Sequence, residues 1–124
     1  MARVLVVDDD AELRRALSRV LGKDGHEVIE AGDGRTALRM FAGDPVDLVL
    51  SDVYMPDMDG IDFLMRARSA FPEARIVIMS GGGNLPAAAV LDAASSLGAD
   101  MTLSKPFTPD EVRAAVERVL AIEK

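Results

Sequence analysis

The sequence contains no cysteine, and it has no apolar run long enough to cross a membrane. The missing cysteines exclude disulfides, thiolate chemistry and zinc–thiolate sites, and they mildly favour a reducing compartment. The apolar run near the N-terminus, Val4–Val7, is too short for the core of a signal peptide, and no run reaches about 18 residues. We therefore expect a cytoplasmic protein that does not associate with membranes.

Basic residues are fewer than acidic residues in this sequence. The chain has 14 Lys and Arg residues against 21 Asp and Glu residues, which gives a formal net charge of −7. The phosphates of DNA would repel such a protein, and no cluster of basic residues offers a local exception, so we expect no direct binding to nucleic acid. The remaining composition is ordinary for a globular protein, with 49% hydrophobic and 28% charged residues. A length of 124 residues predicts one domain, residues 1–124.

Five short apolar runs alternate with segments of helical period. This alternation predicts a parallel β-sheet with helices on both faces, an α/β fold of the doubly wound type. The second run is the weakest, because only Val28 and Ile29 in it are apolar, so we expect it at a sheet edge. The runs are Val4–Val7, Glu27–Glu30, Leu48–Leu50, Arg75–Met79 and Met101–Leu103.

Five helices are predicted between and after these runs. The last is the clearest, because Thr108 and Glu111 form a capping box, Pro109 occupies the first helical position, and an apolar stripe follows. A stripe with i, i+3, i+4 spacing also begins at Leu13, where Asp10 is suited to cap the helix. The other three helices are expected over residues 33–41, 61–71 and 85–97.

Polar residues follow the apolar runs at the ends where parallel sheets bind ligands. Asp8 and Asp9 follow the first run, Asp52 the third, Ser80 the fourth and Lys105 the fifth. In doubly wound folds, ligands bind beyond the carboxyl ends of the strands. We therefore expect these five side chains to meet at one edge of the sheet.

Three carboxylates in one place repel one another unless a cation lies between them, so a divalent metal ion is implied. Magnesium typically takes one or two carboxylates together with water and a phosphate oxygen, which fits Asp9 and Asp52 as direct ligands and Asp8 through water. A carboxylate can also attack phosphorus to form an aspartyl phosphate, with a metal ion and an ammonium group neutralising charge. Asp52 and Lys105 match the nucleophile and the ammonium group.

Each of these residues also has a simpler structural interpretation. Asp8 and Asp9 are compatible with acids at a helix N-terminus, Asp52 with a strand-to-loop turn, and Ser80 and Lys105 with ordinary loops. Taken alone, a turn is the more frequent setting for an aspartate like Asp52. The combination of all five residues favours phosphate chemistry.

Together these motifs resemble the receiver domain of bacterial two-component response regulators over essentially the whole chain. The resemblance implies a flavodoxin-like fold, with a five-stranded parallel sheet of order 2-1-3-4-5 and five helices. The motifs that carry it are Val6-Val7-Asp8-Asp9, the segment Asp52–Gly60, Ser80, Gly98-Ala99-Asp100 and Lys105-Pro106-Phe107.

By this resemblance, Asp52 accepts a phosphoryl group from the phosphohistidine of a sensor histidine kinase or from a phosphotransfer protein. Mg²⁺ is expected on Asp9, Asp52 and the main-chain carbonyl of Tyr54, with Asp8 in the outer part of the pocket. Such a domain catalyses its own phosphorylation and dephosphorylation and is not otherwise an enzyme.

The resemblance also assigns Lys105 to the phosphoryl oxygens and Ser80 to a hydrogen bond with one of them. It implies a cis peptide bond between Lys105 and Pro106. The signal is expected to leave through a face formed by the fourth helix, fifth strand and fifth helix. Because the chain ends at Lys124, just after the last helix, we expect the recipient to be a separate protein.

Two features depart from the family pattern. The position three residues before Lys105 usually holds an aromatic residue that moves with the hydroxyl residue, and here it is Thr102. The segment between Ser80 and Gly98 is also longer than usual and begins with three glycines. We hypothesise that this loop and the fourth helix carry the conformational change instead, because glycines offer little resistance to reorganisation.

Two other classes of function compete with this interpretation. A receiver-like interaction module would bind partners without phosphorylation. The intact Asp8, Asp9, Asp52, Ser80 and Lys105 argue against such a module, and Thr102 is the feature that leaves it open. A metal-dependent phosphohydrolase with an aspartate nucleophile commonly carries a second aspartate two residues later, and here that position holds Tyr54.

Overall fold

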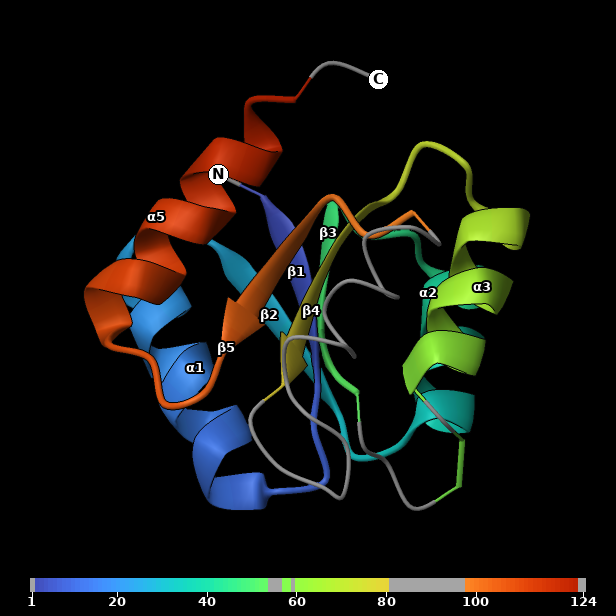
Figure 1. The fold of residues 1–124 in the computed structure, drawn as a ribbon, viewed down its shortest axis with the longest axis horizontal. Coiled ribbons are helices and arrows are strands. Elements are labelled where there is room, and N and C mark those ends of the chain that lie inside the picture. The colour runs from blue at the N-terminus through green and yellow to red at the C-terminus, as the bar shows by residue number, and fades with distance from the viewer. Residues whose placement is uncertain (1, 54–56, 59, 81–97, 123–124) are drawn as a thin grey trace.

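A computed structural model of the chain describes residues 2–53, 57–58, 60–80 and 98–122. Within these residues, five parallel strands form one sheet in the order β2-β1-β3-β4-β5, which confirms the predicted order (Figure 1). The weak second run does form an edge strand. Each strand is one or two residues longer than its apolar run. The strands are β1 (Arg3–Val7), β2 (Glu27–Ala31), β3 (Leu48–Asp52), β4 (Arg75–Ser80) and β5 (Met101–Ser104).

Four helices lie within the described residues and cover both faces of the sheet. Helices α1 and α5 pack against one face, and α2 and α3 against the other (Figure 1). The predicted helix at 85–97 lies outside the described residues. The helices are α1 (Ala11–Lys23), α2 (Gly34–Gly43), α3 (Gly60–Ala70) and α5 (Pro109–Leu120).

Side chains that bind the free N–H groups of the first turn set the helix starts. Asp10 caps α1 by accepting hydrogen bonds from the N–H groups of Glu12 and Leu13. Thr108 and Glu111 form the predicted capping box at the start of α5. Both helix starts are therefore determined by local sequence, as predicted.

The sheet separates two hydrophobic clusters. Alternate residues of a strand point to opposite faces, so Val49 of β3 joins the cluster under α2 and α3, whereas Leu48 and Leu50 join the cluster under α1 and α5. β3 is buried along its whole length, whereas every residue of β5 keeps some exposure. The central strand is therefore held from both faces.

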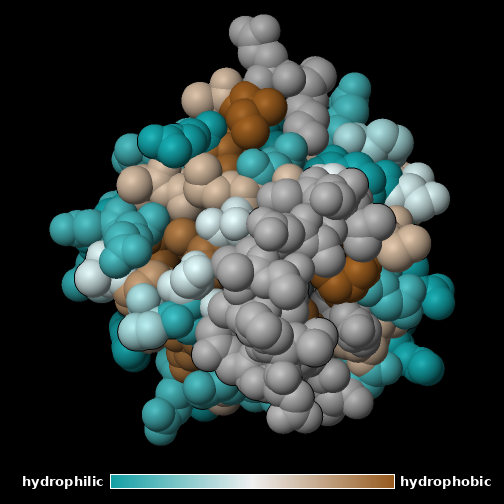
Figure 2. Space-filling view, viewed as in Figure 1, coloured by the Kyte–Doolittle hydropathy of each residue, from teal (hydrophilic) through white to brown (hydrophobic). Residues whose placement is uncertain are grey.

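The face shown in Figure 2 is mainly hydrophilic at its left and right margins, and apolar residues appear there in small separate patches. Met65 of α3 is one large apolar side chain that reaches the surface, with 51% of it exposed. None of the helices formed by the described residues combines the length and the apolar character needed to span a bilayer.

Arg68, near the end of α3, ties the chain that leads into β5 to the start of β4. Its guanidinium group donates hydrogen bonds to the carbonyl oxygens of Ala74 and Gly98, and it pairs with Asp100 at 2.9 Å. The same oxygen of Asp100 accepts the N–H of Ile76 at 2.8 Å. Gly98 has a φ of 109°, a left-handed main-chain conformation in which a residue with a side chain would be strained. We call Arg68, Gly98 and Asp100 the Arg68 clamp.

Candidate functional site

Polar residues predicted from the sequence meet at the carboxyl ends of the strands. One carboxylate oxygen from each of Asp8, Asp9 and Asp52 lies within 4.8 Å of the others. Tyr54, predicted to offer its main-chain carbonyl, lies outside the described residues. The places of the others in the fold are Asp8 and Asp9 directly after β1, Asp52 at the end of β3, Ser80 at the end of β4, and Lys105 directly after β5.

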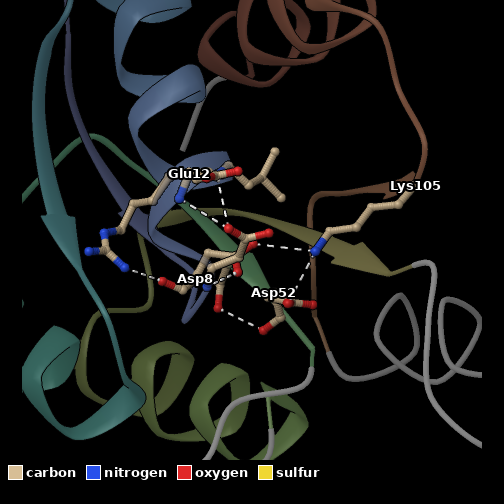
Figure 3. A network of polar contacts seen from close by, with 8 residues as sticks. Asp8, Glu12, Asp52 and Lys105 are labelled. Atoms are coloured by element: carbon tan, nitrogen blue, oxygen red, sulfur yellow. Dashed lines mark hydrogen bonds and ion pairs between the residues drawn. The ribbon is translucent and has the colours of Figure 1, made fainter.

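The ammonium group of Lys105 bridges two of the carboxylates (Figure 3). Its Nζ lies 3.2 Å from Asp52 Oδ2 and 3.3 Å from Asp8 Oδ2. The main-chain N–H of Lys105 donates to the carbonyl of Ser80 at 2.7 Å. The Lys105–Pro106 peptide bond is cis, as the resemblance implied. Residues from four strand ends, those of β1, β3, β4 and β5, therefore share one polar network.

Burial differs among the three carboxylates. Asp8 is fully buried and Asp52 is 7% exposed, whereas Asp9 is exposed. Burial raises the pKa of Asp8, and the charge of Asp52 adds to this. A hydrogen bond from the Asp10 N–H and the charge of Lys105 oppose the rise in the Asp8 pKa. The net pKa of Asp8 is above the usual value, so its ionised form is costly in the metal-free protein.

The pKa of Lys105 is raised above its usual value. Burial alone would lower this pKa, but the carboxylates of Asp52 and Asp8 more than offset that effect through charge and hydrogen bonds. The cluster offers three carboxylates against the one ammonium group of Lys105, so it can carry an excess of negative charge. Oxygen ligands with this charge suit a divalent cation such as Mg²⁺, so the residues present fit the implied metal.

The hydroxyl of Ser80 is fully buried and has no hydrogen-bond partner among the described residues. Leaving a buried polar group unsatisfied costs about 1–3 kcal/mol, so such groups normally have a partner. Ser80 lies one residue beyond Met79, which is the partner of Asp52 in the β3–β4 register. A hydrogen-bond acceptor that enters this end of the sheet would satisfy the hydroxyl.

Sequence reasoning missed Arg14, which holds the acidic segment from the side of α1. Its Nη1 donates to the main-chain carbonyl of Asp8 at 2.6 Å, and its Nε donates to Glu30 Oε1 at 3.0 Å. Asp8 is also held by its own N–H, which donates to the Ala31 carbonyl at 3.2 Å, and by its Oδ1, which accepts the Asp10 N–H at 2.9 Å. Nothing in the sequence marks an arginine of an amphipathic helix for such a contact.

Asp57 was part of a recognised motif but was given no role. Its Oδ1 and Oδ2 accept hydrogen bonds from the N–H groups of Gly34 and Arg35, each at 3.0 Å. Both N–H groups belong to the first turn of α2, where Asp33 is the N-cap. Asp57 therefore fastens the segment that follows β3 to the N-terminus of α2.

Comparison with known proteins agrees with this geometry. A family model described as the response regulator receiver domain matches residues 4–117. Sporulation initiation phosphotransferase F of Bacillus subtilis is 35% identical, over 98% of this chain and 95% of that protein. A probable chemotaxis protein CheY of Rhizobium etli is 37% identical, also over 98% of this chain and 95% of that protein. The DNA-binding transcriptional regulator NtrC of Azospirillum brasilense is 39% identical over 96% of this chain, which spans only 24% of that longer protein.

Solved structures are similar over nearly the full chain. The receiver domain of NtrX from Brucella abortus has a TM-score of 0.90 at 30% identity and covers 97% of this chain and 99% of that one. The chemotaxis response regulator CheY4 of Vibrio cholerae has a TM-score of 0.86 at 33% identity and covers 96% of this chain and 98% of that one. The chain belongs to the family of response regulator receiver domains of two-component signalling.

Proposed function

We propose that this chain receives a phosphoryl group on Asp52 from the phosphohistidine of a sensor histidine kinase or of a phosphotransfer protein. A carboxylate oxygen of Asp52 attacks phosphorus, the phosphorus–nitrogen bond to the donor imidazole breaks, and the imidazole leaves with the electron pair of that bond. One observation carries the proposal, namely the 3.2 Å contact of Asp52 Oδ2 with Lys105 Nζ inside an acidic cluster.

Burial favours Asp52 over Asp8 as the acceptor. Asp8 is fully buried, and one of its oxygens accepts the Asp10 N–H. Asp52 keeps 7% exposure and lies beside the ammonium group of Lys105. Asp52 therefore combines access for a donor with a neighbour that can neutralise the charge of the incoming group.

Two side chains are suited to hold the transferred group. The raised pKa of Lys105 keeps its ammonium group protonated, so it can pair with phosphoryl oxygens when Asp52 becomes an acyl phosphate. Ser80 can donate its buried hydroxyl, which lacks a partner among the described residues, to one of those oxygens. Both side chains would thus stabilise the phosphorylated form.

The described residues suited to hold Mg²⁺ are Asp8, Asp9 and Asp52. When bound, the ion would neutralise charge on the carboxylates and on the phosphoryl group. The carbonyl of Tyr54, which the family resemblance adds as a ligand, belongs to the proposal on that ground alone.

The proposed output is a change in binding to a separate protein in the cytoplasm, through the face formed by the fourth helix, β5 and α5. In the β4–β5 register, Ser80 is paired with Ser104, which directly precedes Lys105. A shift at Ser80 or Lys105 would therefore be transmitted to β5, the edge strand of the sheet, which belongs to that face. We take residues 1–124 as one receiver domain, with catalysis limited to its own phosphoryl group.

The test is to incubate the protein with Mg²⁺ and a small acyl-phosphate donor and to follow intact mass over time. We expect wild type to gain one phosphoryl group and Asp52→Asn to gain none. Asp62→Asn, which removes a carboxylate from the surface of α3, is the matched control and should behave like wild type. Absence of an adduct on wild type would favour the phosphorylation-independent interaction module, and rapid turnover of added phosphomonoesters would favour the phosphohydrolase.

A further inference from the structure

Arg14 contacts the peptide group that joins two of the proposed metal ligands. The carbonyl oxygen that accepts its Nη1 at 2.6 Å belongs to Asp8, and that carbonyl is part of the peptide linking Asp8 to Asp9. The side chain of Arg14 is only 20% exposed. The contact therefore lies at the inner edge of the acidic segment rather than on the open surface.

We propose that Arg14 is a positioning residue that orients the Asp8–Asp9 peptide and thereby sets the affinity of the site for a divalent cation. The inference rests on the proposed function, because it assigns the cation to this acidic cluster. A peptide group is planar, so fixing the direction of the Asp8 carbonyl also fixes the main-chain nitrogen of Asp9. The same plane places the Cα of Asp9, and the hydrogen bond from the Asp10 N–H to Asp8 Oδ1 closes a turn across Asp9. Together these two contacts restrain the direction in which the Asp9 side chain leaves the main chain.

Asp8 is held by four contacts, and Arg14 supplies the one made to the peptide that joins it to Asp9. The N–H of Asp8 donates to Ala31 of β2, its Oδ1 accepts the N–H of Asp10, and its Oδ2 pairs with Lys105. These three contacts act on the amide and the side chain of Asp8. Among the hydrogen bonds described around Asp8, the one from Arg14 is made directly to the carbonyl of the Asp8–Asp9 peptide.

The guanidinium group of Arg14 is itself fixed. Its Nε donates to Glu30 Oε1 at 3.0 Å, which ties it to β2. It also lies against Gly32, where a Cβ atom would be 3.5 Å from Nη1. A planar donor whose Nε is fixed in this way is well suited to orient an acceptor at its Nη1.

The charge of Arg14 and its contact with the Asp8–Asp9 peptide predict opposite changes in Mg²⁺ affinity when Arg14 is replaced. A positive charge on the main chain of the acidic segment repels a dication, so removing it should tighten Mg²⁺ binding if charge alone mattered. If Arg14 orients the Asp8–Asp9 peptide, removing it should weaken Mg²⁺ binding. The sign of the change in Mg²⁺ affinity therefore separates the two roles.

The experiment measures the dissociation constant of Mg²⁺ by calorimetric titration of the full chain. We expect Arg14→Gln to bind Mg²⁺ about tenfold more weakly than wild type, the usual size of effect for groups that orient metal ligands. Arg14→Lys keeps the charge but cannot reach both acceptors as a planar fork, so its affinity should fall between the two. Arg15→Gln, the same charge change at the exposed neighbour, is the control and should bind as wild type or slightly more tightly.

A second readout separates positioning from a general loss of structure. At saturating Mg²⁺, the rate of phosphorylation by an acyl-phosphate donor should approach that of wild type in Arg14→Gln, because the lost affinity is overcome by concentration. Thermal unfolding in EDTA checks that the variant is folded. If Arg14→Gln is unfolded, the Mg²⁺ affinity of Arg14→Lys tests the proposal by itself. A wild-type Mg²⁺ affinity in Arg14→Lys would then overturn the proposal.

Two further outcomes would also contradict the positioning role of Arg14. Mg²⁺ affinity in Arg14→Gln equal to or higher than in Arg15→Gln would overturn the positioning role. So would a slower rate in Arg14→Gln that does not recover at saturating Mg²⁺. Failure of the proposed function is distinguishable, since wild type would then form no adduct on Asp52 whatever Arg14 does to Mg²⁺ binding.

Discussion

Lys105 Nζ lies 3.2 Å from Asp52 Oδ2, although the two residues are 53 positions apart in the chain. The same nitrogen lies 3.3 Å from Asp8 Oδ2, so one ammonium group is shared by two carboxylates of which one is fully buried. Among the described residues, Lys105 therefore offsets part of the negative charge of Asp8 and Asp52 in the metal-free protein.

Replacing Lys105 by methionine should destabilise the metal-free protein by about 1–2 kcal/mol, because it leaves two close carboxylates without their shared cation. Added Mg²⁺ should then stabilise Lys105→Met more than it stabilises wild type, since the metal replaces the lost charge. Urea unfolding in EDTA and in Mg²⁺ measures both effects. Lys23→Met, at the exposed end of α1, is the control. An equal gain from Mg²⁺ in wild type and Lys105→Met would contradict this account.

The raised pKa of Asp8 predicts a dependence of stability on pH. The pKa is higher in the folded than in the unfolded chain, so the stabilising contribution of Asp8 is fully present below the unfolded value, about 3.9, and is lost as pH rises through the folded value. Asp8→Asn keeps an acceptor for the Asp10 N–H but carries no charge. It should raise the free energy of unfolding at neutral pH, on the order of 1 kcal/mol.

The gap in unfolding free energy between Asp8→Asn and wild type should shrink as the pH is lowered toward 4. Thermal unfolding at a series of pH values in EDTA measures it. A gap that widened in acid would mean that the folded protein prefers the ionised form of Asp8.

Asp57→Ala should destabilise the protein by about 1–2 kcal/mol, because it leaves the N–H groups of Gly34 and Arg35 without their acceptors at the start of α2. Asp62→Ala removes a carboxylate that makes an exposed ion pair with Arg66, and it should cost less than about 0.5 kcal/mol. Urea unfolding compares the two. Equal losses would show that the contact with α2 adds nothing beyond a surface charge.

Hydrogen exchange tests the hypothesis that the long segment after Ser80 carries the switch. A phosphoryl mimic should change protection within residues 81–97, because position 102 holds threonine instead of an aromatic residue and the segment begins with three glycines. Protection at Ile76 and Asp100 should stay constant, since the Arg68 clamp holds both. Equal protection of residues 81–97 in both states would rule out the hypothesis.

The elements and the meeting of the acidic residues with Lys105 could be predicted from the sequence. Helix starts such as Asp10 and Thr108 depend on neighbouring residues alone. The meeting of strand ends follows from one rule, that parallel strands bring their carboxyl ends to the same edge. The strand order came from the family resemblance, because apolar runs carry no information about which strand lies beside which.

The contacts of Arg14, Asp57 and Arg68 could not be predicted in the same way. Each connects a side chain to main-chain groups of another element. Every residue except proline offers a main-chain N–H and every residue a carbonyl, so no residue type marks the place where such a contact will form. The three residues instead read as solvated positions of helices or turns until the fold brings their partners near.

Because β3 is buried along its whole length, the fold holds the Asp52 side of the site more firmly than the Lys105 side. Asp52 ends a strand enclosed by both hydrophobic clusters, whereas Lys105 follows β5, an edge strand that keeps some exposure at every position. A force applied at this end of the sheet would therefore deform the lysine side first. We expect the acceptor to serve as a fixed reference point, and Lys105 with β5 to travel toward it.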